Sequence, residues 1–363
     1  MWLDANLPEE KRRGRGGAQR FDDPFAREWS RKLYEAGYAG LTWPKEYGGA
    51  GTPYSFQAIV YEELAAAQAP PHVGVIGLSM AGPTIIAHGT EEQKSRYLQP
   101  ILAADEIWCQ GFSEPDAGSD LAAARTRAER RDDVYVVNGQ KVWSSFAHIA
   151  DFCILVTQSD PDRPHYHNLT YLIVDMRAPG VEVRPLRQIT GEAEFNEIFF
   201  SDVEVPVENR LGDEGEGWQV AMTTLLHERA TLGFALTATL DALFGRLLED
   251  ARERDLDPLA REAVGREWIE LQALLYTNYR ALGTYERTGV PGPEGSGVKL
   301  RWSEANQRLT KLAREVLGPE GILDDGWWNH QQLRSRGNTI EAGTSEVLRN
   351  IIAERVLGLP RSR

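Results

Sequence analysis

The sequence is poor in positive charge, in cysteine and in long apolar runs. Its 363 residues carry 40 Lys and Arg against 54 Asp and Glu, a formal net charge of -14. Nucleic-acid binding depends on clustered positive charge, so this balance argues against a nucleic-acid partner. No uncharged apolar run is long enough for a membrane span and no signal peptide is visible, so we expect no membrane partner and a cytoplasmic protein.

The two cysteines and seven histidines form no metal-binding pattern. Cys109 and Cys153 lie far apart in the sequence and in neither a metal-ligand nor a redox spacing. Both have apolar neighbours, which predicts small buried side chains. We therefore expect no metal. The length allows a large core and two or three folding units.

Hydrophobic periodicity divides the chain into helices, strands and helices again. Residues 25–104 have a helical pattern, in which Thr90 and Gln93 form a capping box. Residues 109–212 contain short β-like runs, and Asn138-Gly139 between two of them predicts a hairpin turn. Those runs are Val134–Val137, Gln140–Trp143, Phe152–Thr157, Tyr171–Val174, Val181–Val183 and Phe195–Phe200. The sequence predicts an α+β protein with a middle antiparallel sandwich or barrel.

Residues 213–363 are again predicted to be helical. The expected helices are Trp218–Arg254, Leu259–Arg287, Lys299–Leu317 and Thr344–Leu357. The proline- and glycine-rich stretch at residues 291–297 predicts a loop. It lacks the lysine and the preceding strand of a phosphate-binding motif.

One carboxylate stands on the apolar face of the first of these helices. Glu228 follows Leu225 by three residues and precedes Leu232 by four, both on that face. A carboxylate there costs free energy unless it is paired, and desolvation raises its pKa, as a general base requires. The alternative is a buried ion pair with Arg229 or another arginine, and periodicity alone favours that alternative slightly.

Three other segments present hydroxyl groups next to structural breaks. Ser113–Leu121 combines hydroxyls, a proline and small turn-forming residues, which suits either an ordinary turn or a ligand loop. Trp143-Ser144-Ser145 fits a buried core tryptophan or a platform for a flat aromatic ligand. Gly343-Thr344-Ser345 opens the last helix, where hydroxyl caps are common and where an anion or a carbonyl oxygen can also bind.

Together these segments resemble the acyl-CoA dehydrogenase family over essentially the whole chain. The matching motifs are Phe112-Ser113-Glu114-Pro115, Ala117-Gly118-Ser119-Asp120, Asn138-Gly139-Gln140-Lys141-Val142-Trp143-Ser144-Ser145, Gly343-Thr344-Ser345-Glu346 and Arg349-Asn350-Ile351. The resemblance implies an N-terminal helical domain (1–108), a middle β-domain (109–212) and a C-terminal four-helix bundle (213–363), usually assembled as tetramers. It also implies FAD as cofactor and oxidation of an acyl-CoA thioester at its α and β carbons.

The resemblance assigns residues to the cofactor and to the substrate. Gln110, Phe112, Ser113, Trp143, Ser144, Ser145, Thr344 and Ser345 are expected at the cofactor, and Ser119, Arg229, Ala342 and Gly343 at the acyl-CoA. Many family members carry the catalytic glutamate directly before Gly-Thr-Ser, where this chain has Ala342. Glu341 is one residue too early to replace it. Some members, such as isovaleryl-CoA dehydrogenase, place the base on the long helix before an arginine, so the resemblance favours Glu228 as the base. The amide of Ala342 can still polarise the thioester carbonyl.

A second departure concerns the cofactor diphosphate. The family's Arg-Phe-Gly segment is not recognisable, and Glu315 stands where a glutamine is expected. A carboxylate near a pyrophosphate is unfavourable. Some bacterial relatives, including steroid side-chain dehydrogenases, pair two different subunits that complement each other. The alternatives are therefore a non-catalytic or complementing subunit of a heteromer, or a related flavin oxidase or monooxygenase. An electron-transfer flavoprotein is the expected acceptor of the electrons, and the assembly a homo- or hetero-oligomer.

Overall fold

The computed structural model describes residues 2–12, 24–288, 292, 294–323 and 326–361, which form two compact units. The sheet unit comprises the described part of residues 20–52 together with Pro71–His227. The helical unit comprises Pro53–Pro70, Glu228–Arg363 and the described part of residues 1–19. The division falls within helix α6 (Gly217–Arg252).

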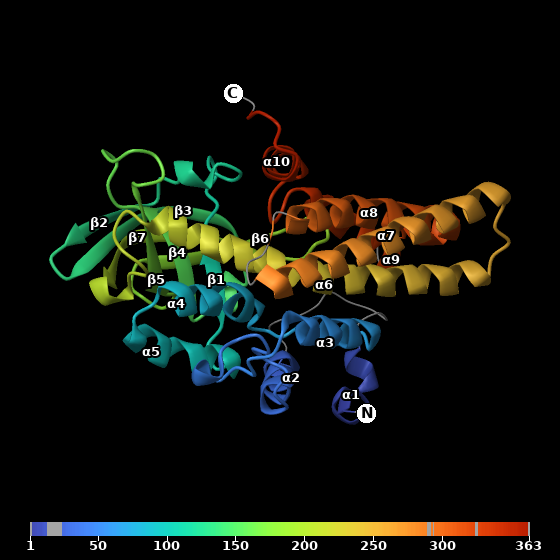
Figure 1. Ribbon diagram of the computed structural model, residues 1–363, viewed down its shortest axis with the longest axis horizontal. Helices are drawn as coiled ribbons and strands as arrows, with labels where there is room; N and C mark the ends of the chain where they lie inside the picture. The colour runs from blue at the N-terminus through green and yellow to red at the C-terminus, as the bar shows by residue number, and fades with distance from the viewer. Residues whose placement is uncertain (1, 13–23, 289–291, 293, 324–325, 362–363) are drawn as a thin grey trace. The chain divides into compact units, whose positions relative to one another are not determined.

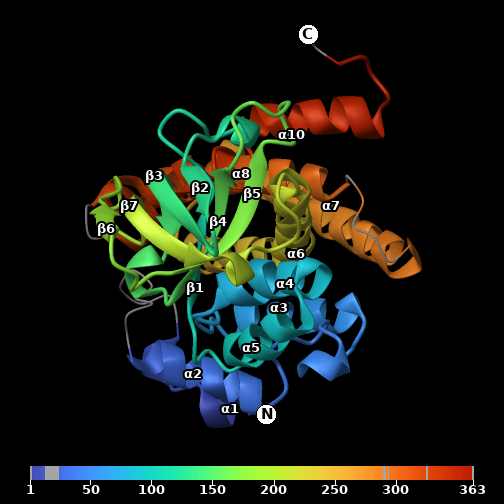
Figure 2. The ribbon, with the colours of Figure 1, turned by 90° about the vertical axis from the view of Figure 1, so that its left-hand side faces the viewer.

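The sheet unit contains a mixed sheet of seven strands among its described residues. They are β1 (Trp108–Gly111), β2 (Arg127–Arg131), β3 (Val134–Ser145), β4 (Phe152–Gln158), β5 (Leu169–Asp175), β6 (Val181–Leu186) and β7 (Phe195–Pro206). Their order is β1-β4-β2-β3-β7-β6, with β5 also paired to β4 (Figure 2). The predicted β runs are confirmed, but the pairing is not antiparallel throughout, because β1 and β2 run parallel to β4.

The predicted hairpin turn at Asn138-Gly139 is wrong. Strand β3 runs straight through both residues, and Asn138 pairs with Arg127 of β2. The register against β7 shifts between Val137 and Gly139, as in a β-bulge. A Cβ on Gly139 would lie 2.7 Å from the Cα of Thr126. The glycine is therefore required by a close backbone approach rather than by a turn.

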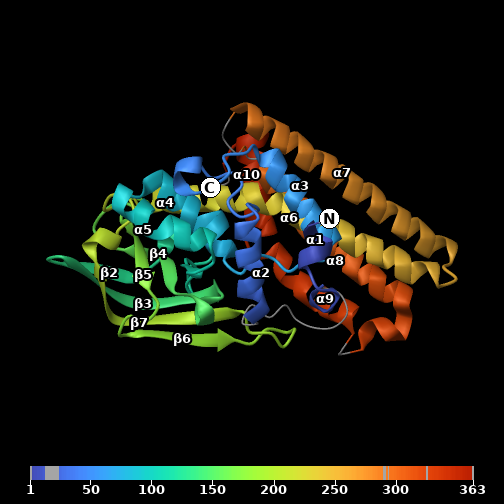
Figure 3. The same ribbon diagram turned by 90° about the horizontal axis from the view of Figure 1, so that it is seen from below.

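Helices cover one face of this sheet, as Figure 3 shows for α4 (Gly82–His88) and α5 (Glu91–Leu102). The predicted capping box of α5 is confirmed: the Gln93 amide donates to Thr90 Oγ1 at 3.2 Å and the Thr90 amide donates to Gln93 Oε1 at 2.9 Å. A π-helical turn (Gly77–Ala81) precedes α4, and α2 (Pro24–Glu35) belongs to the same unit. The core between helices and sheet includes Ile85, Leu98, Ile101, Trp108 and Ile154.

The helical unit is built from long helices that run side by side in Figure 1. Its elements include α3 (Tyr54–Ala66), α7 (Pro258–Thr288), α8 (Glu294–Leu317), α9 (Trp327–Ser335) and α10 (Ser345–Ile351), besides most of α6. Their core includes Leu240, Leu243, Leu247, Leu271, Trp302 and Leu309. The predicted bounds of α6 and α7 are correct to within two residues. The predicted loop at 291–297 is wrong from Glu294 onward, because α8 begins there, and residues 291 and 293 lie outside the described part of the chain. Helix α9 was not predicted.

Two features of the helical unit bear on how the chain is organised. Helix α6 is long and apolar enough to cross a membrane by length and composition alone, but its Leu240, Leu243 and Leu247 are buried in the core, as is typical of a bundle helix.

Helix α3 packs on α7, where Tyr279 donates to Glu62 Oε1 at 2.7 Å. The compact units therefore divide residues 1–108 between them.

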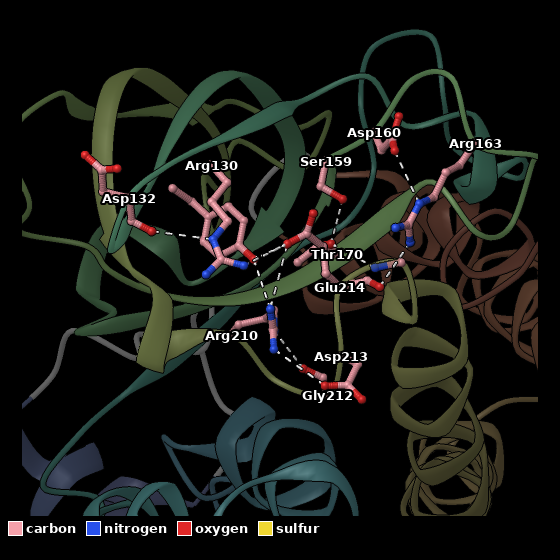
Figure 4. A network of polar contacts seen from close by, with 12 residues as sticks. Arg130, Asp132, Ser159, Asp160, Arg163, Thr170, Arg210, Gly212, Asp213 and Glu214 are labelled. Carbon is pink, nitrogen blue, oxygen red and sulfur yellow. Dashed lines mark hydrogen bonds and ion pairs between the residues drawn. The ribbon is translucent and has the colours of Figure 1, made fainter.

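A polar network in the sheet unit fixes the segment that leads from β7 into α6 (Figure 4). Arg210 donates to the carbonyl oxygen of Gly212 at 3.0 Å and to the Tyr135 hydroxyl at 3.2 Å. Tyr135 in turn donates to Glu214 Oε2 at 2.9 Å. The amide of Gly215 donates to Thr170 Oγ1 at 3.3 Å. The start of the long helix is thereby tied to the sheet.

Candidate active site

A buried ion pair holds the Ser113 loop of the sheet unit. Lys141 Nζ donates to Glu114 Oε1 at 2.7 Å and to the carbonyl oxygen of Phe112 at 3.0 Å, and the Lys141 side chain is fully buried. Glu114 also accepts from the amides of Arg125 at 2.7 Å and Thr126 at 2.8 Å. Burial opposes the charged form of Glu114, but Lys141 and the amide donors outweigh it and lower the pKa of Glu114. These contacts fix the backbone of the loop at Phe112 and Glu114.

The predicted residues of this loop differ in exposure. The side chain of Phe112 is buried in the core, edge-to-face with Tyr171 at a centroid distance of 5.8 Å. Its ring therefore has a structural role, and only its backbone is available to a ligand. Gln110 and Ser113 are half-buried, whereas Ser119 is exposed.

A second bulge in β3 turns Trp143 out of the sheet ladder. The register against β7 shifts between Lys141 and Ser144, and Trp143 has a positive φ of 59°. Its side chain is 58% exposed and meets Phe195 edge-to-face at 6.0 Å. The alternative interpretation of Trp143 as a core residue is therefore wrong. An exposed indole at a sheet end offers a flat surface on which an aromatic ligand can stack.

Ser144 and Ser145 follow Trp143 on β3. Ser144 is buried, and its Oγ has no hydrogen-bond partner among the described residues. Its carbonyl oxygen accepts a hydrogen bond from Asn196 at 3.2 Å. Ser145 is half-buried and pairs with Phe195. A buried hydroxyl normally has a partner, so Ser144 is suited to a polar ligand atom.

Glu228 lies on α6 in the helical unit and is partly buried. It interacts electrostatically with Lys299 of α8, as does Glu341. The helix continues through Arg229, but the side chain of Arg229 lies outside the described part of the structure. The acid that sequence periodicity placed on the apolar face thus has a buried lysine as one charged neighbour.

Two consecutive left-handed residues form a turn before α10. Ala342 has a φ of 50° and Gly343 a φ of 94°, and the former is a costly conformation for a residue with a Cβ. The amides of Ala342, Gly343 and Thr344 donate to no atom of the described residues. We refer to Ala342–Thr344 as the amide turn. Unpaired amides in a fixed turn are suited to bind a carbonyl oxygen.

The hydroxyl of Thr344, the last residue of this turn, and that of Ser345, the residue after it, behave differently. Thr344 Oγ1 caps α10 by accepting from the amide of Val347 at 3.2 Å, which confirms the capping interpretation for that atom. Ser345 is buried, and its Oγ has no partner among the described residues. Glu341 is held by Arg334 at 2.9 Å and by Asn338 at 2.7 Å. Its carboxylate therefore braces the turn.

Comparison with known proteins assigns the family. Models of the acyl-CoA dehydrogenase N-terminal, middle and C-terminal domains match residues 12–105, 109–203 and 215–357. The chain belongs to the acyl-CoA dehydrogenase family. It is an oxidoreductase of this family, whose cofactor is FAD. Among curated relatives, acyl-CoA dehydrogenase IpdE1 of Mycobacterium tuberculosis is 42% identical, over 99% of this chain and 96% of the relative.

Solved acyl-CoA dehydrogenase structures share the fold. "Tcur3481-Tcur3483 steroid ACAD" has a TM-score of 0.91 and 30% identity, over 99% of this chain and 95% of that one. The ChsE4-ChsE5 complex from Mycobacterium tuberculosis has a TM-score of 0.85 and 32% identity, over 94% and 91%. The predicted architecture of N-terminal helices, middle β-domain and C-terminal helices is confirmed.

The described residues fit the family's cofactor. The exposed Trp143 indole and the unpartnered hydroxyl of Ser144 provide a stacking face and a polar contact in the sheet unit. The helical unit provides the unpartnered hydroxyl of Ser345. Sequence reasoning missed Lys141 and Lys299 as anchors. For Lys299 a signal existed, because Lys299, Ser303, Asn306 and Thr310 form a polar stripe at helical spacing.

Proposed function

We propose that this chain oxidises an acyl-CoA thioester at its α and β carbons, with FAD as cofactor and Glu228 as the base. The observation that carries this proposal is the link between Glu228 and the amide turn within the helical unit. Lys299 donates to the carbonyl oxygen of Gly343 at 2.9 Å and interacts electrostatically with Glu228. The proposed base and the backbone of the amide turn thus have the same buried lysine as a charged neighbour.

The chain's own residues have distinct roles in this reaction. Amides at Ala342 and Gly343 hold the thioester carbonyl oxygen and stabilise the negative charge that develops there as the α C–H bond breaks. The Glu228 carboxylate accepts the α proton. FAD, when bound, would supply the oxidant that takes up the β hydrogen of the substrate as hydride. Trp143, Ser144 and Ser145, with the backbone of Gln110–Ser113, would orient the isoalloxazine, and Thr344 and Ser345 would provide further contacts.

We also infer a second chain in the assembly. Glu315 is exposed and pairs with Lys311 at 3.5 Å, at the position where the family resemblance expects a glutamine at the diphosphate. Two of the similar structures are named for two different chains, Tcur3481-Tcur3483 and ChsE4-ChsE5, and the first name includes "steroid". These names support a heteromeric acyl-CoA dehydrogenase acting on a bulky acyl group. An electron-transfer flavoprotein would reoxidise it.

The visible spectrum under anaerobic conditions tests the proposal. Protein loaded with FAD should lose its flavin absorbance when an acyl-CoA is added. Glu228→Gln should slow this bleaching by about 10²–10⁴-fold while acyl-CoA still binds, because an amide cannot accept the proton. Glu341→Gln is the matched control and should continue to bleach, because Glu341 serves as a brace held by Arg334.

The other outcomes separate the alternatives. Undiminished bleaching by Glu228→Gln would refute Glu228 as the base. A chain that is colourless alone, gains flavin only with a second chain and does not bleach through Glu228 would be a complementing subunit. Rapid reoxidation of the bleached protein by air would instead indicate an oxidase or monooxygenase.

A further inference from the structure

A lysine is buried beneath the amide turn. Lys299 is 4% exposed, and its ammonium group donates to the carbonyl oxygen of Asn338 at 2.7 Å and to that of Gly343 at 2.9 Å. These two carbonyls bracket the segment that contains Glu341 and Ala342. One cation therefore holds both ends of the segment that shapes the turn.

The other residues of a buried polar stripe on α8 also form hydrogen bonds near this segment. Ser303 Oγ donates to the same carbonyl oxygen of Asn338 at 2.9 Å, and Asn306 Nδ2 donates to Asn338 Oδ1 at 2.7 Å. Thr310 Oγ1 donates to Ser335 Oγ at 3.3 Å. Burying four polar side chains is costly unless their partners are fixed, so the stripe specifies one position for this segment.

The turn itself requires such support. Ala342 has a left-handed backbone, and a positive φ is unfavourable at a residue with a Cβ unless the surroundings hold it in place. The Asn338 and Gly343 carbonyls are the points at which Lys299 supplies that restraint. Without the ammonium group, the turn would lose a charge-assisted contact on each side of Ala342.

The charge of Lys299 also interacts with two carboxylates outside the amide turn, those of Glu341 and Glu228. Burial lowers the pKa of Lys299 to about 8, while the carboxylates of Glu341 and Glu228 oppose that shift. Both carboxylates belong to the helical unit, and Glu341 is already paired with Arg334. Because Coulomb attraction is mutual, a protonated Lys299 favours the carboxylate form of Glu228.

We propose that Lys299 is a positioning residue: by holding the Asn338 and Gly343 carbonyls it fixes the amide turn in the conformation that binds the thioester carbonyl oxygen, and its charge keeps Glu228 ready to accept the α proton. This role rests on the proposed function of Glu228. Lys299 acts through the turn and through Glu228.

Ligand binding without turnover tests the first part. The experiment uses FAD-loaded protein carrying Glu228→Gln. Calorimetry measures its affinity for an acyl-CoA and for the matching alkyl-CoA thioether, which lacks the carbonyl oxygen. The thioester should bind about tenfold more tightly, which is the worth of one or two hydrogen bonds. Adding Lys299→Met should abolish this preference. Adding Ser303→Ala, which removes a neutral donor to the same Asn338 carbonyl, should keep most of it.

The pH profile of kcat/KM tests the second part with Glu228 intact. Wild-type activity should fall above about pH 8, where Lys299 becomes neutral. Lys299→Met should lack this alkaline limb, and its acid limb should move to higher pH because the carboxylate form of Glu228 has lost its cation. A purely structural role would lower activity at every pH, as expected for Ser303→Ala, and leave both limbs in place.

The outcomes separate this inference from the proposed function. Bleaching that survives Glu228→Gln overturns Glu228 as the base, whatever Lys299 does. A Lys299→Met protein that retains both the thioester preference and the wild-type limbs overturns the role of Lys299. If Lys299→Met does not fold, Lys299→Arg provides the test: it keeps the charge and so the acid limb, while the larger guanidinium should displace the turn and reduce the thioester preference.

Discussion

At the scale of single residues, exposure and partners depend more on where a side chain lies in the fold than on its chemical type. Phe112 and Trp143 are both aromatic and both belong to the family motifs, yet Phe112 is buried and Trp143 is 58% exposed. A bulge in β3 accounts for the difference, because it rotates Trp143 out of the ladder. Glu228 and Glu341 are likewise both candidate acids, but Glu341 is occupied by Arg334. Residue roles therefore follow from neighbours that are distant in sequence.

His72 provides a prediction at this scale. Its Nδ1 accepts from the Gly74 amide at 3.0 Å, its Nε2 is buried, and burial lowers the pKa of His72 to about 4. Between about pH 6.5 and pH 4 the unfolded chain binds a proton that the folded protein rejects, so stability decreases as pH falls through this window. His72→Asn keeps an acceptor near Nδ1 and should remove that contribution.

Urea unfolding at pH 7 and pH 5 measures the effect. The loss of unfolding free energy between these pH values should be smaller in His72→Asn by about 2 kcal/mol, from the shift of the His72 pKa. The exposed His165 offers a control, and His165→Asn should leave the loss unchanged. An unaltered pH dependence in His72→Asn would contradict the prediction.

At the scale of elements, buried lysines anchor both loops that carry family motifs. Lys141 of β3 holds the Ser113 loop through Glu114, and Lys299 of α8 holds the amide turn. In each case a long, regular element provides the cation and an irregular segment provides the acceptors. The two irregular segments thereby gain a fixed shape from rigid neighbours, as positioning of reacting groups would require.

Removing only one partner of the Lys141–Glu114 pair should cost more stability than the loss of the interaction alone. Lys141→Met should destabilise the folded protein by about 3–5 kcal/mol, because it leaves the Glu114 carboxylate buried without its cation. The Lys141→Met, Glu114→Gln double variant should be less destabilised than the sum of the two single variants, by about 1 kcal/mol or more. A double-mutant cycle by urea unfolding measures this coupling.

A more exposed pair provides the comparison. Lys32 and Glu28 form an i,i+4 ion pair at 2.8 Å on α2. Lys32→Met should cost less than about 0.5 kcal/mol, since solvent screens exposed pairs. If Lys141→Met were as mild as Lys32→Met, the buried pair would not anchor the loop.

At the scale of the whole molecule, the two compact units do not follow chain order. The helical unit takes α3 from the N-terminal part of the chain, and the sheet unit takes the start of α6. The N-terminal start of α6 is tied to the sheet by the network in Figure 4, while Glu228, further along, belongs to the helical unit. The continuous helix thus belongs to both units, and the proposed base is the first residue that it contributes to the helical unit.

Cofactor content provides a prediction at this scale. If Glu315 weakens diphosphate binding, Glu315→Gln should increase the affinity for FAD severalfold, corresponding to about 1 kcal/mol of relieved repulsion at an exposed site. Absorbance of the purified protein gives flavin per chain, and light scattering gives the assembly. Glu320→Gln, at another exposed acid in the helical unit, is the control. Unchanged flavin content in Glu315→Gln would argue against a role for Glu315.

The sequence by itself determined features that depend on local interactions. Long helices such as α6 and α7 follow from apolar periodicity, and the capping box of α5 from two residues three apart. The family motifs identified the architecture because each is a short, contiguous string. The prediction that Glu228 lies on an apolar helix face also used only the sequence of its own helix.

Only the tertiary structure decided features that depend on distant segments. Asn138-Gly139 has the composition of a turn, but the approach of Thr126 makes it part of a strand. Lys299 is charged, and yet carbonyls from residues about 40 positions away make its burial possible. A local sequence pattern indicates the propensity of a segment for helix, strand or turn. The burial and pairing of a side chain depend instead on backbone groups from distant segments, which become its neighbours only in the folded structure.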